Sequence, residues 1–194
     1  MKKSWIVIIV IAVAALGLFA WVKGAYNGFV SSEEQVQSAW SQVENVYQRR
    51  ADLIPNLVAT VKGYAEHESE TFAAVTEART NATSIKVENL SEAELAKFQQ
   101  AQDALSQALG RLIAVREAYP ELKANENFRD LQAQLEGTEN RITVERNKFN
   151  EAVRAYNVSI RRFPSNILAS VFGFSQKGYF TANAGAENAP VVAF

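Results

Sequence analysis

The sequence predicts an all-α protein in which a single N-terminal transmembrane helix is followed by an elongated antiparallel bundle of long helices. Three observations lead to this prediction. An uninterrupted apolar run lies near the N-terminus, apolar residues recur every three or four positions over long stretches, and turn-forming residues are scarce. Only 9 glycines and 4 prolines occur among 194 residues, which argues against a turn-rich β-sandwich. We expect three parts: an anchor over 1–23, the bundle over 24–163 and a C-terminal tail over 164–194.

The anchor is expected over residues 5–22, which contain no charged or strongly polar side chain. As a helix this run would span ~27 Å, enough to cross the hydrocarbon core of a bilayer. Trp5 and Trp21 lie at its two ends, where aromatic rings prefer the headgroup level. A cleaved signal peptide is the alternative, but its apolar region would be only ~7–15 residues long.

The positive charges that flank the apolar run favour one orientation. Lys2, Lys3 and the amino terminus precede the run, whereas only Lys23 follows it. The positive-inside rule therefore favours a cytoplasmic N-terminus and a bundle on the non-cytoplasmic side of the membrane.

The first helix of the bundle is expected over 26–80, with a kink or short break at Pro55, which lacks an amide donor. A helix of this length would reach ~80 Å and would overhang the rest of the bundle next to the membrane. Its apolar residues Phe29, Val36 and Trp40 would then have no obvious partner in the chain. An exposed apolar stripe usually marks an interface, so we expect self-association into a homo-oligomer, unless the tail covers the stripe.

Two further helices are expected over 91–119 and 125–162, because Ser91 with Glu94 spells a capping box and Asn125 is a favourable N-cap. Their strict heptad spacing is typical of antiparallel coiled coils and bundles, and the short connection makes them antiparallel neighbours. The predicted register places five pairs of residues opposite each other: Tyr119 and Phe128, Leu112 and Leu135, Leu105 and Ile142, Gln102 and Glu145, and Phe98 and Phe149.

The tail has few charges and many aromatic residues. These include two that we single out as candidate interaction residues, Phe172 and Phe174. The composition permits three positions for the tail: on the bundle, at the bilayer surface, or on a neighbouring subunit.

Several short segments occur in an order that resembles the LemA family over about residues 26–164. They are Tyr26-Asn27, Ala39-Trp40, the run from Tyr47 to Val58, Val61-Lys62-Gly63-Tyr64-Ala65, His67-Glu68, the run from Tyr119 to Asn125, the run from Leu135 to Ile142, and Phe163-Pro164. The resemblance implies a bacterial single-pass protein of the inner (plasma) membrane with a long-helix bundle. It also implies a frequent genetic association with membrane proteases, but it supplies no reaction.

Most site chemistries find no support in the sequence. The chain has no cysteine and one histidine, which excludes thiolate sites and makes a conventional catalytic triad improbable. Glu66, His67, Glu68 and Glu70 do not have the Glu-x-x-His spacing of a di-iron bundle, so no metal or other cofactor is expected. The net charge of −1 argues against a nucleic-acid partner.

Two polar clusters remain as candidate structural networks or interaction sites. Arg49, Arg50 and Asp52 lie beside Pro55, where they could satisfy backbone groups freed by the proline. The run Glu139-Asn140-Arg141 follows two small residues, Gly137 and Thr138, that would let helices approach closely around a buried hydrogen-bond network.

The sequence as a whole favours a non-enzymatic scaffold, with the lipid bilayer and copies of itself as partners. An adaptor or regulator of a membrane protease is the alternative, resting on the family association. An enzyme of unrecognised type that uses one of the two polar clusters is a third hypothesis.

Overall fold

The computed structural model describes residues 2–181, with side chains from residue 4, and it is all-α over that range. Its elements are α1 (Lys2–Lys62), α2 (Ser69–Ser84), α3 (Glu92–Ala114), the 3₁₀ turn η1 (Val115–Glu117), α4 (Pro120–Ala124), α5 (Glu126–Arg161) and α6 (Ser165–Val171). The predicted fold class is confirmed. Both predicted caps are present as well: Ser91 and Glu94 form a capping box, and Asn125 accepts from the amide of Phe128 at 2.9 Å.

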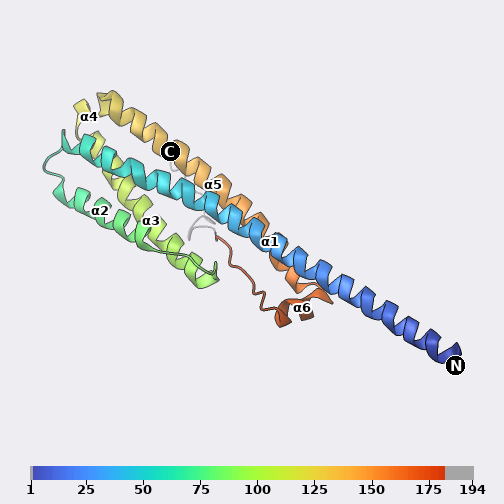
Figure 1. Cartoon of the computed structure of the whole chain (residues 1–194). Helices are drawn as coiled ribbons and strands as arrows, with labels where there is room; N and C mark the ends of the chain where they lie inside the picture. The colour runs from blue at the N-terminus through green and yellow to red at the C-terminus, as the bar shows by residue number, and fades with distance from the viewer. Residues whose placement is uncertain (1, 182–194) are drawn as a thin grey trace, which may run out of the picture.

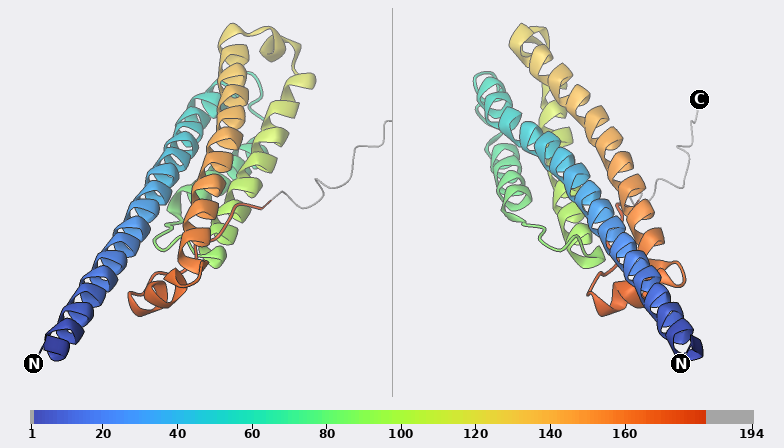
Figure 2. Two further views of the ribbon diagram at one scale, coloured as in Figure 1. Left: turned by 90° about the vertical axis from the view of Figure 1, so that its right-hand side faces the viewer. Right: turned by 45° about the vertical axis from the view of Figure 1, so that its right-hand side comes forward.

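Four helices, α1, α2, α3 and α5, form an antiparallel up-and-down bundle (Figures 1 and 2). Within it, α1 packs most closely along α5, and α2 packs along α3. The N-terminal part of α1 continues well beyond the other helices, and α6 lies beside α1 where it leaves the bundle (Figure 1).

The projecting part of α1 is the predicted anchor. Side chains from Ser4 to Ala20 are exposed, as expected for a segment whose natural surroundings are lipid. Among the described residues, α1 is the one helix long and apolar enough to cross a membrane.

The predicted helix over 26–80 is wrong. α1 runs without interruption through Pro55 and ends at Lys62, where a turn over 63–68 reverses the chain into α2. His67 therefore lies exposed in a turn. Because α2 folds back, the part of α1 inside the bundle is about as long as α5, and the predicted overhang does not exist.

Pro55 does not break α1 because another helix supplies the missing donor. In a regular helix, the carbonyl of Ala51 would accept from the amide of residue 55, and proline has none. Arg79, on α2, donates from its Nε to this carbonyl at 2.8 Å. Polar side chains near Pro55 were expected to satisfy the backbone here, but the residue that does so, Arg79, comes from a different helix.

The core consists of two hydrophobic clusters arranged along the bundle. The cluster nearer the anchor is rich in aromatic side chains and includes Phe29, Val36, Trp40, Val43, Tyr47, Phe98, Ile142, Phe149, Val153, Tyr156, Ile160 and Phe180. The far cluster is mainly aliphatic and includes Ile54, Leu57, Val61, Phe72, Val75, Leu105, Leu109, Leu112, Leu122, Phe128 and Leu135.

The predicted register between α3 and α5 is only partly correct. Leu105 and Ile142 belong to different clusters. Phe98 and Phe149 share a cluster, but the Trp40 ring contacts both, with centroid distances of 5.3 and 5.6 Å. The apolar stripe of α1 is buried between α3 and α5. These two helices, which were predicted to pack directly against each other, are therefore separated.

Candidate functional site

A buried polar layer separates the two clusters, and Arg50 of α1 is its centre. Arg50 is 2% exposed. Its Nη1 donates to Glu139 Oε2 of α5 at 2.8 Å and to Ser106 Oγ of α3 at 2.9 Å. Its Nη2 donates to Gln102 Oε1 at 2.6 Å. One guanidinium therefore joins three helices, which is how a buried charge is tolerated in a core.

The layer also reaches α2 and influences two titratable neighbours. Gln102 Nε2 donates to the carbonyl of Ala82 at 3.3 Å, so all four long helices take part. Burial raises the pKa of Tyr47, whose ring lies 5.2 Å from the Arg50 guanidinium carbon. Burial also raises the pKa of Asp103, although the positive charges of Arg146 and Arg50 oppose that shift.

Only Arg50 and Glu139 of the two predicted polar clusters meet. Arg49, Asn140 and Arg141 are exposed on their helices, and the exposed Asp52 accepts from Gln48 Nε2 at 2.8 Å. The predicted partner of Gln102 is also wrong, because Gln102 binds Arg50 while Glu145 pairs with Lys148. No other helix approaches Gly137 closely, since a Cβ added there would meet nothing within 4 Å.

The tail forms the second part of the site. After α6 the chain turns at Gly173 (φ +78°) and runs back along the anchor-side half of the bundle in extended form to Thr181 (Figure 1). Of the three predicted positions for the tail, the structure shows the first for residues up to Thr181, and Phe194 lies outside the described residues.

Three side-chain amides hold the extended segment by its backbone. Asn157 and Asn150 of α5 each accept from one amide and donate to the carbonyl of the same residue, Lys177 and Phe180 respectively, with all four distances at 2.9 Å. Gln99 of α3 binds Thr181 in the same two-point manner at 3.0 and 3.3 Å. These side chains act as the edge of a β-strand would, so the tail is held without a sheet. We call residues 174–181 the strap.

Aromatic contacts attach two side chains of the strap, Phe174 and Phe180, to the core. The ring of Phe180 stacks on Trp40 at 6.0 Å and meets Phe149 edge-on at 5.5 Å. Phe174 packs against Phe29 at 5.2 Å. The stripe predicted to be exposed is therefore buried, by α3, α5 and the tail together, and it offers no free surface for self-association.

The residues that hold the strap were not among the candidates predicted from the sequence. Asn150 and Asn157 are one heptad apart, next to the apolar stripe of α5, and this repeat was the available signal. Nothing in the sequence alone indicated that Gly178 would lie against another helix. A Cβ there would lie 2.7 Å from Cα of Glu92, so only glycine lets the strap approach the start of α3, where its amide donates to the carbonyl of Leu90 at 2.8 Å.

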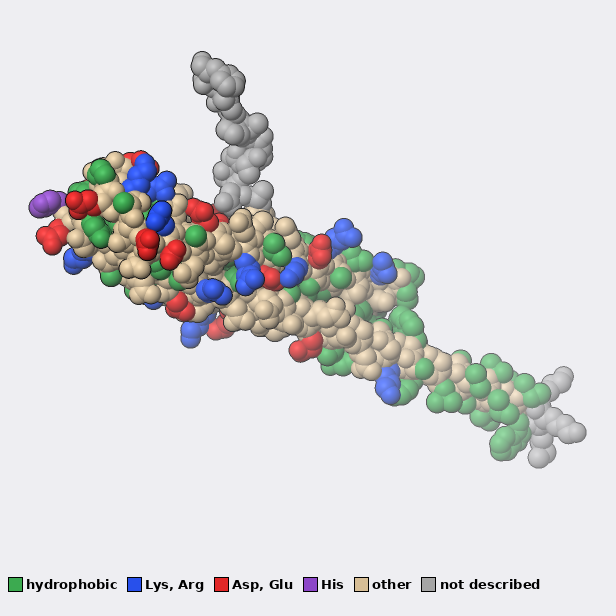
Figure 3. All heavy atoms as spheres, turned by 90° about the horizontal axis from the view of Figure 1, so that it is seen from above, with side chains coloured by type: hydrophobic (Ala, Val, Ile, Leu, Met, Phe, Trp, Pro, Cys, Tyr) green, Lys and Arg blue, Asp and Glu red, His purple; other side chains and the backbone are tan. Residues whose placement is uncertain are grey.

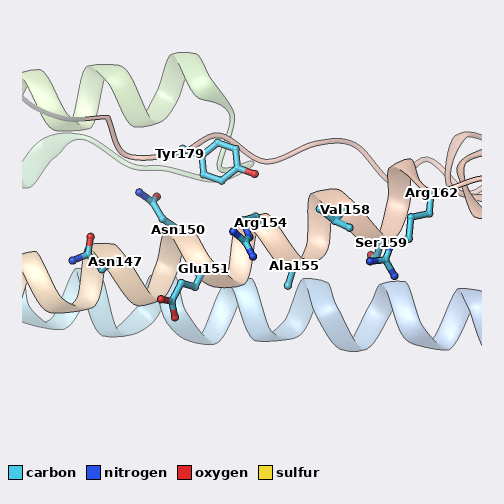
Figure 4. Close-up of a pocket in the computed structure, with 9 residues that line it drawn as sticks. All are labelled: Asn147, Asn150, Glu151, Arg154, Ala155, Val158, Ser159, Arg162 and Tyr179. Carbon is cyan, nitrogen blue, oxygen red and sulfur yellow. The ribbon is translucent and has the colours of Figure 1, made fainter.

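An open groove of about 950 Å³ runs along the outer side of α5, with Tyr179 of the strap at its edge (Figure 4). Charged residues of both signs line it, including Glu151, Arg154 and Arg162. Between residues 4 and 181 no group of three or more histidine or acidic side chains is placed to hold a metal ion.

Comparisons with known proteins agree with this architecture. The chain is 29% identical over 174 residues to "Magnetosome protein MamQ 2" of Paramagnetospirillum magneticum, covering 80% of this chain and 64% of that protein. It is 28% identical to "Magnetosome protein MamQ" of Magnetospirillum gryphiswaldense, covering 89% and 71%. It is 23% identical to "Protein LemA" of Metamycoplasma hominis, covering 88% and 76%. The chain thus spans slightly less than two thirds of the length of the first of these relatives.

The model of the LemA family matches residues 39–194, a range that contains the Arg50 layer, the strap and all of the bundle except the first turns of α1 beyond the membrane. The protein therefore belongs to the LemA family.

Proposed function

We propose that this protein is a membrane-anchored scaffold without enzymatic activity, which assembles with copies of itself at the bacterial inner membrane. The observation that carries the proposal is the continuity of α1. One helix of 61 residues forms both the apolar segment and a core element of the bundle. Every copy in a membrane therefore holds its bundle at the same height, which raises the effective concentration for lateral contacts.

The α5 groove is the surface that we propose for contact between copies. Glu151 and Arg154 both line it and lie about one helical turn apart. Copies anchored in one membrane would pack in parallel about a two-fold axis along the membrane normal. In that arrangement Glu151 of each copy can approach Arg154 of the other, so the groove complements itself in charge.

Sedimentation of the full chain in mild detergent at micromolar concentration tests this contact. We expect a dimer or larger assembly for the wild type. Arg154→Glu should dissociate it because acidic residues would then face each other. The exchanged pair Glu151→Arg with Arg154→Glu should restore it, since complementarity returns. If the wild type is a monomer, the self-assembly proposal is wrong. If it assembles and neither variant changes the assembly, the copies do not meet at this groove.

A native pull-down from gently solubilised membranes separates the scaffold from the other hypotheses. Recovery of the chain with copies of itself supports the scaffold. Recovery of a stoichiometric membrane protease would support the adaptor alternative, and a retained small molecule would support an enzyme.

We further propose that the bundle lies on the non-cytoplasmic side, as the flanking lysines favour. The natural chain has no cysteine, so Ala73→Cys on the exposed side of α2 provides a unique thiol. A membrane-impermeant maleimide added to intact spheroplasts should label it. Labelling only after lysis would show that the bundle lies on the cytoplasmic side instead.

A further inference from the structure

We infer that α6 is a second membrane contact, and that its outward apolar face lies in the headgroup region of the bilayer that α1 crosses. The inference rests on the anchor of the proposed function and goes beyond it. It assigns the bundle two attachment points instead of one.

The first observation is an exposed apolar face on and beside α6. Phe163 is 82% exposed, Val171 72% and Ile167 56%. The opposite side of α6 faces the bundle, where Ala169 is buried and Leu168 packs against the anchor-side cluster. No charged residue occurs between Phe163 and Gln176. Large exposed side chains on a short, ordered helix indicate an apolar partner.

The second observation is the height of this face above the membrane. The Phe172 ring, at the end of α6, meets Tyr26 of α1 with centroids 5.1 Å apart. Tyr26 is four residues beyond Val22, the end of the apolar run, which is about 6 Å along a helix. Each headgroup region is ~5–8 Å thick. A bilayer crossed by residues 5–22 therefore reaches the level of Tyr26 and of Phe172, at the C-terminal end of α6.

The third observation is the kind of surface around α6. Hydrophobic side chains continue from the projecting part of α1 onto the adjoining end of the bundle (Figure 3). Arg161 and Arg162 are exposed at the C-terminal end of α5, next to α6. Apolar residues flanked by arginines suit an interfacial element in an anionic membrane. Continuity with the anchor favours lipid over a second copy as the partner of this face.

The absence of natural cysteines allows a matched test on the full chain. Val171→Cys reports on α6, and Val144→Cys, at an exposed valine in the middle of α5, is the control. Each thiol is labelled with the environment-sensitive fluorophore NBD. The protein is reconstituted at high lipid excess into phosphatidylcholine–phosphatidylglycerol vesicles whose lipids carry a nitroxide either at the headgroup or deep in the acyl chain.

We expect blue-shifted emission at position 171, and quenching by the headgroup nitroxide several-fold stronger than at position 144. Water-like emission at 171, or quenching equal to that at 144, would overturn the inference. So would blue-shifted emission without nitroxide quenching that reverts when the protein is diluted in lipid, because a second copy would then cover the face.

Extraction with alkaline carbonate keeps this inference separate from the anchor. If the labelled protein is extracted, α1 does not anchor it, and the proposed function fails as well. If the protein resists extraction while position 171 stays in water, only the second contact fails. In an anchored protein, Ile167→Asp should abolish the headgroup quenching at 171 without changing resistance to carbonate.

Discussion

The two halves of the bundle differ in the side chains and backbone elements that fill their cores. The far half is filled by aliphatic side chains from α1, α2, α3 and α5. In the anchor-side half, α2 has already ended at Ser84, and its place is taken by residues 85–90 and the strap. Aromatic rings from Trp40, Phe98 and Phe180 fill this half. Irregular backbone leaves wider and less regular gaps than a fourth helix, and large flat rings fill them.

The Arg50 layer lies at the boundary between the two halves. Arg50 follows Tyr47 of one cluster and precedes Ile54 of the other, and Gln102 lies in the same way between Phe98 and Leu105. A polar layer at this level fixes the register of the helices, because sliding one of them would leave a buried charge unpaired. We therefore expect a substitution on either side of the layer to destabilise its own half of the bundle first.

The largest effect is expected from Leu105→Asp in the far half. Leu105 is 1% exposed, so the variant buries a charge without a designed partner at a cost of several kcal/mol, comparable with the whole stability of a small domain. Ala104→Asp, on the exposed side of the same turn, is the control and should leave urea unfolding of the detergent-solubilised chain nearly unchanged. Equal urea midpoints for the two variants would contradict the placement of Leu105 on the buried face of α3.

The next largest effect is expected from Gly178→Ala in the anchor-side half. The added methyl would lie 2.7 Å from a backbone atom of Glu92, so the strap must move, at a cost of about 1–3 kcal/mol. Hydrogen exchange should rise around Trp40 and remain low around Leu112. The matched variant Gly137→Ala has open space on a helix, and it should gain about 0.5–1 kcal/mol.

At the boundary, Gln102→Leu should cost about 1–3 kcal/mol. The structure shows Gln102 as a 2.6 Å acceptor for the buried Arg50, so a leucine there leaves the guanidinium short of a partner. Replacing both residues, with Arg50→Met, removes the buried charge together with its partner and should recover most of the loss. A double-mutant cycle in urea measures the coupling, and additive effects would show that the two side chains do not act as a unit.

A smaller effect, about 1 kcal/mol, is expected from Arg79→Ala, which leaves the carbonyl of Ala51 without its donor. The effect should disappear in a Pro55→Ala background, because alanine restores the helical amide. An undiminished cost of Arg79→Ala in that background would mean that Arg79 stabilises the bundle in another way.

The last prediction concerns pH. Burial, aided by the charge of Glu33, raises the pKa of Tyr156 to about 12, and its hydroxyl donates to the carbonyl of Ser175 at 3.0 Å. A tyrosine in the unfolded chain titrates near pH ~10. The contribution of Tyr156 to stability is therefore complete below pH ~10 and is lost as the pH rises through about 12. Urea midpoints of the wild type should fall more steeply over this range than those of Tyr156→Phe.

The helices α3 and α5 and their N-terminal caps could be predicted because local signals determine them: heptad spacing, Ser91 with Glu94, and Asn125. The end of α1 could not be located, because apolar residues continue through the turn at 63–68 and the proline at 55 is the more obvious breaker. The side chains around Pro55, Arg50 and the strap could not be assigned, because each pairing joins residues that are far apart in sequence. Arg79 and Ala51, or Gln99 and Thr181, meet only once the whole bundle is built.

The absence of a joint in α1 has a mechanical consequence. Bilayers of different thickness impose different tilts on a helix that crosses them. Because the same helix extends ~55 Å from Ala25 to Lys62, a change of ~10° at the anchor moves the far end of the bundle sideways by ~10 Å. Any tilt that the membrane imposes on the anchor would therefore appear as a lateral displacement of the turn at 63–68.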